Sequence, residues 1–148
     1  MLQAALFPAE SAADADDKLG AAFCAATSPE LRRGEGITLT PEWLVQRMIE
    51  RCAAAGDFST VVDAGAGSGR FAIAAARRWP RARIVAVERS ARMLELLRSN
   101  LHAKGLQGRV EVVEGDFRDA ELPLAGRALF IGNPPFVRHH DITPEWKA

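Results

Sequence analysis

The sequence predicts an α/β fold, a mostly parallel sheet with helices on both faces that is preceded by a short helical segment. After Gly56, short β-branched runs alternate with helical stretches, which favours right-handed strand–helix–strand crossovers. A glycine-rich turn follows the first run, where a strand would lead into a helix. The runs IVAV (84–87) and LFI (129–131) are apolar at every position, as expected for strands buried on both faces.

Residues 1–33 are predicted to form a helical N-terminal extension, rich in alanine and aspartate. FPAES (7–11) and TSPE (27–30) indicate helix starts, since serine supplies an N-cap oxygen and proline suits a first turn. A further helix is predicted to have Thr40 as its N-cap and Pro41 in its first turn, and to end at Gly56.

Four strands and two more helices are predicted after that helix. The strands are TVVDAG (60–65), RIVAVE (83–88), RVEVVEGD (109–116) and ALFIG (128–132). The helices are GRFAIAAARRW (69–79) and SARMLELLRSNLHAKG (90–105). The carboxyl ends of parallel strands lie at one edge of a sheet, which is where open α/β folds bind ligands.

The composition is that of an ordinary globular protein. The 148 residues are 48% hydrophobic and 26% charged, with a formal net charge of zero. This predicts one domain, or part of one, without a general nucleic-acid or membrane surface. One stretch is rich in arginine, and we interpret it as a solvated helix face: Arg70, Arg77, Arg78, Arg81 and Arg83.

Cys24 and Cys52 lack the spacing of a zinc site or a disulfide framework, so we predict no metal and a reducing, cytoplasmic location. The first 20 residues lack a basic start and a continuous apolar run. No later segment has the roughly 18 apolar residues of a membrane helix. We therefore expect neither export nor membrane insertion.

Gly65, Gly67 and Gly69 lie in the turn between the first strand and the next helix. Glycine permits positive φ and close approach of a ligand, while the helix N-terminus offers N–H groups to a carboxylate or phosphate. A nucleotide-like ligand is therefore predicted. The dinucleotide fingerprint G-x-G-x-x-G fits poorly because Arg70 replaces its third glycine, and a purely structural turn remains an alternative.

Acidic residues end the neighbouring strands. Glu88 follows IVAV about 20 residues beyond the turn, where a carboxylate can accept both ribose hydroxyls. Asp116 stands beside Phe117 after the third strand, a pair suited to accepting an adenine amine and packing on its ring. Each acid alone also fits a solvated strand end or a helix cap. Together with Asp63, however, they end three successive strands at one edge.

The turn Asp63-Ala-Gly-Ala-Gly-Ser-Gly69 resembles the D/E-x-G-x-G-x-G turn of class I S-adenosylmethionine-dependent methyltransferases. The resemblance covers residues 34–148, which would form a Rossmann-like cofactor-binding domain. It implies S-adenosylmethionine as the cofactor. The three glycines would approach its methionine part, Glu88 its ribose, and Asp116 with Phe117 its adenine, and Asp63 belongs to the same predicted site.

GNPPF (132–136) resembles the Asn/Asp-Pro-Pro-aromatic motif of methyltransferases that act on planar amino groups. A conjugated amine is a poor nucleophile, and two acceptors on its hydrogens, the Asn133 side-chain oxygen and the Pro134 carbonyl, can aim its lone pair. Pro134 and Pro135 would hold the loop still, and Phe136 would stack on the flat substrate. A proline-rich strand exit with a buried phenylalanine is the alternative.

Two features favour adenine in DNA as the substrate. RRGEGITLTP (32–41) resembles a segment of adenine-specific DNA methyltransferases of restriction systems, in which Thr40 and Pro41 would help to bind the methionine end. Basic residues follow the motif, and they would meet phosphate or belong to a solvated loop: Arg138, His139 and His140. Release-factor glutamine and RNA base methyltransferases resemble this pattern too, and a non-catalytic cofactor-binding module is a third hypothesis.

The resemblance also implies a seven-stranded sheet in the order 3-2-1-4-5-7-6, of which this chain would hold the first four strands. We therefore expect the amino-terminal portion of a larger methyltransferase, truncated after the fourth strand, or one piece of a split one. DNA is the predicted substrate. A second polypeptide or a missing C-terminal region would complete the sheet and supply target recognition, and the fragment alone is expected to be inactive.

Overall fold

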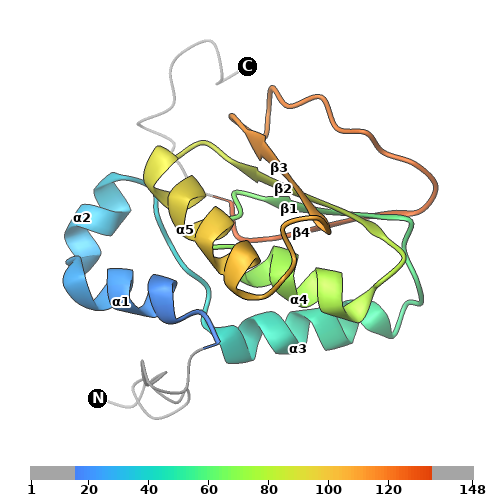
Figure 1. Cartoon of the computed structure of the whole chain (residues 1–148), viewed down its shortest axis with the longest axis horizontal. Helices are drawn as coiled ribbons and strands as arrows, with labels where there is room; N and C mark the ends of the chain where they lie inside the picture. The colour runs from blue at the N-terminus through green and yellow to red at the C-terminus, as the bar shows by residue number, and fades with distance from the viewer. Residues whose placement is uncertain (1–15, 135–148) are drawn as a thin grey trace, which may run out of the picture.

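A computed structural model describes residues 16–134 of the chain (Figure 1). Helices α1 (Lys18–Ala26), α2 (Pro29–Gly34) and α3 (Glu42–Ala53) come first. Strands and helices then alternate: β1 (Thr60–Ala64), α4 (Arg70–Arg78), β2 (Arg83–Glu88), α5 (Ala91–Ala103) and β3 (Val110–Glu114). Residues 115–127, which form neither helix nor strand, lead to β4 (Ala128–Ile131).

The four strands form one parallel sheet in the order β3-β2-β1-β4. The predicted Rossmann-like α/β class, with a short helical N-terminal segment, is therefore confirmed. Right-handed connections explain the layers. The chain moves outward from β1 to β2 to β3, which puts α4 and α5 on one face. The return from β3 to β4 runs the other way and crosses the opposite face.

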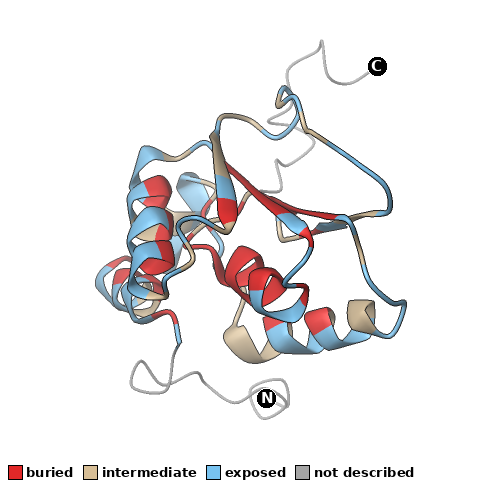
Figure 2. Ribbon diagram, turned by 45° about the vertical axis from the view of Figure 1, so that its right-hand side comes forward, coloured by how far each residue is buried: buried red, intermediate tan, exposed pale blue. Residues whose placement is uncertain are grey.

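Helices α3, α4 and α5 share one hydrophobic core with their face of the sheet. Helix α4 lies at the centre of this core, and its residues 70–76 are all buried (red in Figure 2). On the other face, the buried valines of β1 and β2 pack against side chains of residues 115–127. Helices were predicted on both faces, but within the described residues they cover one face of the sheet, and residues 115–127 cross the other.

Local capping explains where the helices begin. Ser28 caps α2 by accepting a backbone N–H at 3.2 Å, and Pro29 lies in the first turn, as predicted. Helix α3 begins one residue later than predicted, because Pro41 and not Thr40 is its N-cap. The Thr40 carbonyl instead accepts a hydrogen bond from a buried arginine at 2.8 Å, which holds this residue ahead of the helix. The predicted start at residues 7–11 lies outside the described residues.

No helix between residues 16 and 134 is both long and apolar enough to cross a membrane. The same part of the chain contains no group of three or more histidine, cysteine or acidic side chains that could hold a metal ion. The thiols of Cys24 and Cys52 are both free.

Candidate functional site

The glycine-rich turn connects β1 to α4 at the carboxyl edge of the sheet. Gly65, Gly67 and Gly69 have φ angles of 74°, 56° and 93°, a region that favours glycine. A Cβ at Gly67 would also lie 2.8 Å from the end of the Leu39 side chain, which would have to shift. The Gly65 N–H donates to the Val87 carbonyl of β2 at 2.9 Å. The turn is therefore held closely on both sides, as a preformed binding loop requires.

Asp63, the acid that precedes the turn, is buried at the end of β1 with 1% of its surface exposed. Its Oδ2 accepts the Ala72 N–H at 2.9 Å, which fixes the first turn of α4 to the strand. Its Oδ1 has no hydrogen-bond partner within the described residues. Burial raises the pKa of Asp63 to about 7 with help from the charge of Glu88, against the opposing effect of the Ala72 bond. One buried oxygen at this edge can therefore still bind a ligand.

Glu88 ends β2 with its carboxylate against the turn. Its Oε2 accepts the Gly67 N–H at 2.8 Å. Its Oε1 accepts the N–H groups of Arg89 and Ser90 at 2.9 and 2.8 Å. A carboxylate has about four acceptor positions, so one remains by count for a ribose hydroxyl. A ribose that used two positions would displace one backbone donor.

Asp116 and Phe117 follow β3 at the same edge. The Asp116 carboxylate accepts the side chain of Arg118 at 3.0 and 2.7 Å and its backbone N–H at 3.0 Å. These bonds, with the charges of Arg118 and Arg89, lower the pKa of Asp116 to about 2. Phe117 packs edge-on against Phe130 of β4, with ring centroids 6.3 Å apart. Asp116 is therefore an anion at neutral pH, but Arg118 already uses most of its acceptor positions.

The segment before α3 lies against the glycine-rich turn. The end of the Leu39 side chain lies 2.8 Å from where a Cβ at Gly67 would be. Arg70, the first residue of α4, donates from Nη1 to the Thr40 carbonyl at 2.8 Å. The fold therefore brings Thr40 and the adjoining Pro41 to the turn, although they are separated from it by a helix and a strand in the sequence.

Strand β4 leads into the predicted amine-holding loop beside β1. Ile131 pairs with Asp63 in the sheet, so Gly132 follows at the end of β1. A Cβ at Gly132 would lie 2.9 Å from the Ala64 carbonyl oxygen and 3.0 Å from Asp63 Oδ1. The half-buried Asn133 comes next in the chain, so it begins beside the strand that carries the turn. Pro134 is the last described residue, and the predicted residues outside are Pro135, Phe136, Arg138, His139 and His140.

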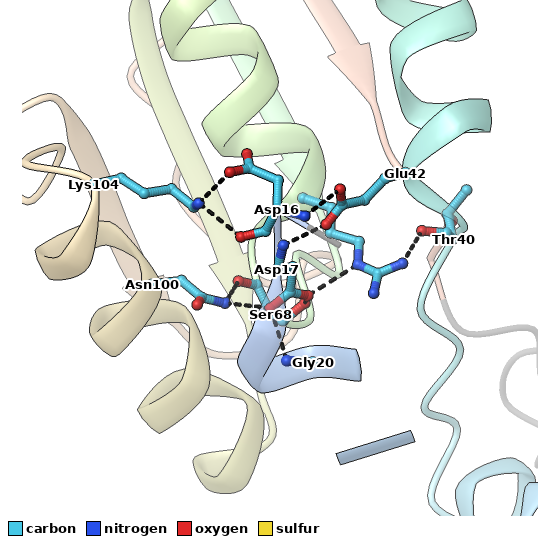
Figure 3. A network of polar contacts seen from close by, with 9 residues as sticks. Asp16, Asp17, Gly20, Thr40, Glu42, Ser68, Asn100 and Lys104 are labelled. Carbon is cyan, nitrogen blue, oxygen red and sulfur yellow. Dashed lines mark hydrogen bonds and ion pairs between the residues drawn. The ribbon is translucent and has the colours of Figure 1, made fainter. Parts of the chain in front are cut away.

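A buried polar cluster behind the turn was not predicted (Figure 3). The interpretation of Arg70 as part of a solvated helix face is wrong, since its side chain is 7% exposed and its Nε donates to Asp17 Oδ2 at 2.9 Å. Ser68 and Asn100 donate to the same carboxylate. The other four arginines of that stretch are exposed, but only Arg77 and Arg78 lie on a helix, because α4 ends before Arg81 and Arg83 begins β2. The one sequence signal that could have pointed to this cluster was Arg70 at the position of the third glycine in the dinucleotide fingerprint.

This edge and its fold have counterparts among known proteins. Residues 61–136, just over half of the chain, match the family described as "Methyltransferase domain". The chain belongs to this family. The match begins in β1 and ends at Phe136, so it contains the turn, the strand-end acids and the whole NPPF motif. The predicted membership in the class I methyltransferases is confirmed.

Three relatives illustrate the range of the family. The type II methyltransferase M.XamI of Xanthomonas campestris pv. amaranthicola is 47% identical over 114 residues, 76% of this chain and 22% of that protein. A release factor glutamine methyltransferase of Chlorobaculum tepidum is 36% identical over 103 residues, 65% of this chain and 35% of that protein. An RNA methyltransferase of Salinibacter ruber, crystallised with S-adenosyl-L-homocysteine, is 34% identical with a TM-score of 0.50, over 56% of this chain and 53% of that one. The chain therefore spans between a fifth and about half of the length of these relatives.

Proposed function

We propose that the chain is the cofactor-binding portion of a cytoplasmic restriction-modification enzyme that methylates the exocyclic amino group of adenine in DNA. One observation carries the proposal: Gly132 packs on Ala64 and Asp63, so the strand end that precedes Asn133 adjoins the glycine-rich turn. An amine held by Asn133 would then lie close to a cofactor held by the turn. The 47% identity to the type II methyltransferase M.XamI supports DNA as the substrate.

The cofactor is S-adenosylmethionine, which supplies a methyl group on a positively charged sulfur. The residues at this edge fit it. The turn has partly exposed backbone without side chains at Gly65 and Gly67, and Asp63 keeps one oxygen that has no partner in the described residues. Glu88 has an acceptor position for the ribose, and Asp116 can take the adenine amine where Arg118 yields one position. Thr40 and Pro41 stand near the methionine end.

The chain's own residues would activate the amine. The Asn133 side-chain oxygen and the Pro134 carbonyl accept its two hydrogens, which draws the lone pair out of conjugation with the ring and aims it for direct transfer. Pro135 keeps this loop still, because proline fixes φ. Phe136 stacks on the base once it has left the duplex.

Glutamine in a release factor is the second candidate substrate, because a relative named for that activity is 36% identical over 103 residues. A side-chain amide is also a planar nitrogen whose lone pair is conjugated, so the same two acceptors suit it. RNA bases are a further variant, favoured by the Salinibacter ruber enzyme. All these reactions would use the same cofactor-binding edge of the sheet. They differ in the methyl acceptor that binds beside the cofactor.

Labelled cofactor distinguishes these substrates. The full-length enzyme that contains this chain is incubated with methyl-labelled S-adenosylmethionine and, separately, with duplex DNA, RNA or a release factor. We expect the label in DNA, recovered as N6-methyladenine. Asn133→Ala should lose most of this transfer and keep its cofactor affinity, since Asn133 would touch the amine only. Label in RNA or release factor would overturn the DNA assignment, and undiminished transfer by Asn133→Ala would make the motif structural.

A further inference from the structure

A cluster of buried polar side chains joins the N-terminal segment to the back of the glycine-rich turn (Figure 3). Asp17 lies at its centre and is 2% exposed. Its Oδ1 accepts the Gly20 N–H and the Asn100 side-chain amide, both at 2.7 Å. Its Oδ2 accepts Arg70 Nε at 2.9 Å and the Ser68 hydroxyl. The four donors therefore use all of the roughly four acceptor positions of this carboxylate.

Ser68 and Arg70 connect Asp17 to the cofactor edge. Ser68 is part of the turn itself, and Asn100 also holds the Ser68 carbonyl at 3.0 Å. Arg70 donates from Nη1 to the Thr40 carbonyl, so its guanidinium links Asp17 to the segment before α3. Through one carboxylate, Asp17 therefore fixes both backbone segments that the resemblance assigns to the methionine end.

The segment that carries Asp17 is itself anchored. The Glu42 carboxylate of α3 accepts the Asp16 N–H at 2.7 Å and also the Asp17 N–H. The Asp16 carboxylate pairs with Arg77 of α4 at 2.7 Å and with Lys104, at the end of α5, at 2.6 Å. Three helices therefore hold this segment, which gives Asp17 a fixed position relative to the turn.

The negative charge of Asp17 suits this setting. Burial alone would raise its pKa, but hydrogen bonds from Ser68, Arg70, the Gly20 N–H and Asn100 together hold the pKa below its usual value. A neutral group in its place would set a buried guanidinium against a partner without charge. Such a change is costly, because the remaining charge has been removed from water.

We propose that Asp17 is a positioning residue for the methionine end of S-adenosylmethionine. It sets the turn at Ser68 and the segment at Thr40 to the spacing that this end of the cofactor requires. This role rests on the proposed cofactor. Asp17 acts through Ser68 and Arg70, and the N-terminal segment is then a part of the cofactor site.

Two ligands separate this role from a general loss of stability. Asp17→Asn keeps the side-chain shape but, whichever way its amide is turned, places an NH2 group against two of the four donors. By calorimetry on the full chain, its dissociation constant for S-adenosylhomocysteine should rise about tenfold or more. That for 5′-methylthioadenosine, which lacks the amino-acid end, should stay within about twofold. Glu30→Gln is the control, because the exposed Glu30 carboxylate pairs with Arg33 on its own helix and lies outside the cluster, and it should leave both constants within about twofold.

Ser68→Ala provides a second variant if Asp17→Asn does not fold, because it removes one hydroxyl from the turn. It should weaken S-adenosylhomocysteine about threefold or more and spare 5′-methylthioadenosine. Equal weakening of both ligands would mean that the cluster only stabilises the fold, and unchanged S-adenosylhomocysteine binding would remove Asp17 from the cofactor site. Either result overturns the proposal. Failure of the proposed cofactor is distinct, since the wild-type chain would then bind neither ligand, whereas a methyl acceptor other than DNA would leave both dissociation constants unchanged.

Discussion

Two carboxylates on adjacent strands hold the glycine-rich turn in different ways. Glu88 accepts three backbone N–H groups, whereas Asp63 accepts one and is almost fully buried. A carboxylate that loses water and gains a single donor favours its protonated form. Asp63 therefore takes up a proton more readily than an exposed aspartate does.

The raised pKa of Asp63 makes the stability of the fold depend on pH. The pKa is about 7 in the folded chain against 3.8 for an ordinary aspartate. Between these two pH values the native state holds a proton that the unfolded state has released. The free energy of unfolding should fall as pH rises, by roughly 2–3 kcal/mol between about pH 5 and about pH 8. Asp63→Asn should flatten this slope, because asparagine does not titrate in this range, and its side-chain oxygen can still accept the Ala72 N–H. Urea unfolding across this range measures both slopes, and equal slopes would mean that Asp63 is ionised in the fold.

At this scale the sequence predicts the turn and the strand-end acids, because their spacing reflects local backbone geometry. It does not predict the cluster around Asp17, whose partners Ser68 and Asn100 follow 51 and 83 residues later. Asp17 is also the N-cap of α1, a common place for aspartate, so its second role leaves no local trace. The ligand contacts of Glu88 and Asp116 stay predictions.

Among the elements, β4 reaches the site only because Gly132 has no side chain. Its φ is 153°, and an added Cβ would meet the Ala64 carbonyl oxygen at 2.9 Å and the Ala64 nitrogen at 3.2 Å. These are backbone atoms of β1, at the centre of the sheet, and they cannot move aside. Gly132→Ala should therefore lower the free energy of unfolding by about 1–3 kcal/mol, measured in guanidinium chloride.

Gly108→Ala is the matched control, because nothing lies within 4 Å of a Cβ at that position. It should be neutral or stabilise the chain by less than about 1 kcal/mol. If Gly132→Ala proved as stable as Gly108→Ala, β4 would separate from β1 at little cost. The amine-holding loop would then not be held at a fixed position beside the glycine-rich turn.

The sequence predicts the order of strands and helices because strands appear as apolar runs between turn residues. The expected burial on both faces holds for IVAV in β2 but is wrong for LFI in β4, where Phe130 is 49% exposed. The sequence misplaces the start of α3 by one residue for a tertiary reason. Arg70, on the helix that follows β1 in the sequence, binds the Thr40 carbonyl and keeps it ahead of α3. Capping residues predict such boundaries only where no distant side chain competes for the backbone.

In the whole molecule, β4 is an edge of the described sheet and pairs with β1 alone. Phe130 on this strand is 49% exposed, and Phe117 beside it is 36% exposed. An edge that combines unpaired backbone groups with apolar side chains favours pairing with another chain. We therefore expect the isolated chain to self-associate or to require another polypeptide, and to transfer no methyl group by itself.

Sedimentation velocity, with thermal unfolding, measures this association. Phe130→Glu should reduce it, because a charge on an edge strand opposes pairing. Leu31→Glu is the matched control, since Leu31 is 53% exposed on α2 and not on the edge. A monodisperse monomer that unfolds cooperatively and methylates DNA unaided would contradict this expectation, and would mean that the sheet is completed in another way.

The position of Asp17 also sets an order of events during synthesis. Asp17 is made 83 residues before Asn100, one of the side chains that satisfy its carboxylate. Contacts this distant form late, because the intervening chain must first be confined. Until α5 emerges from the ribosome, α1 cannot pack against it, and the turn lacks the hydrogen bond that Asn100 donates to the Ser68 carbonyl. A nascent chain that stalls before α5 would therefore lack a complete cofactor site. The cofactor could not bind such a chain and protect it from proteolysis.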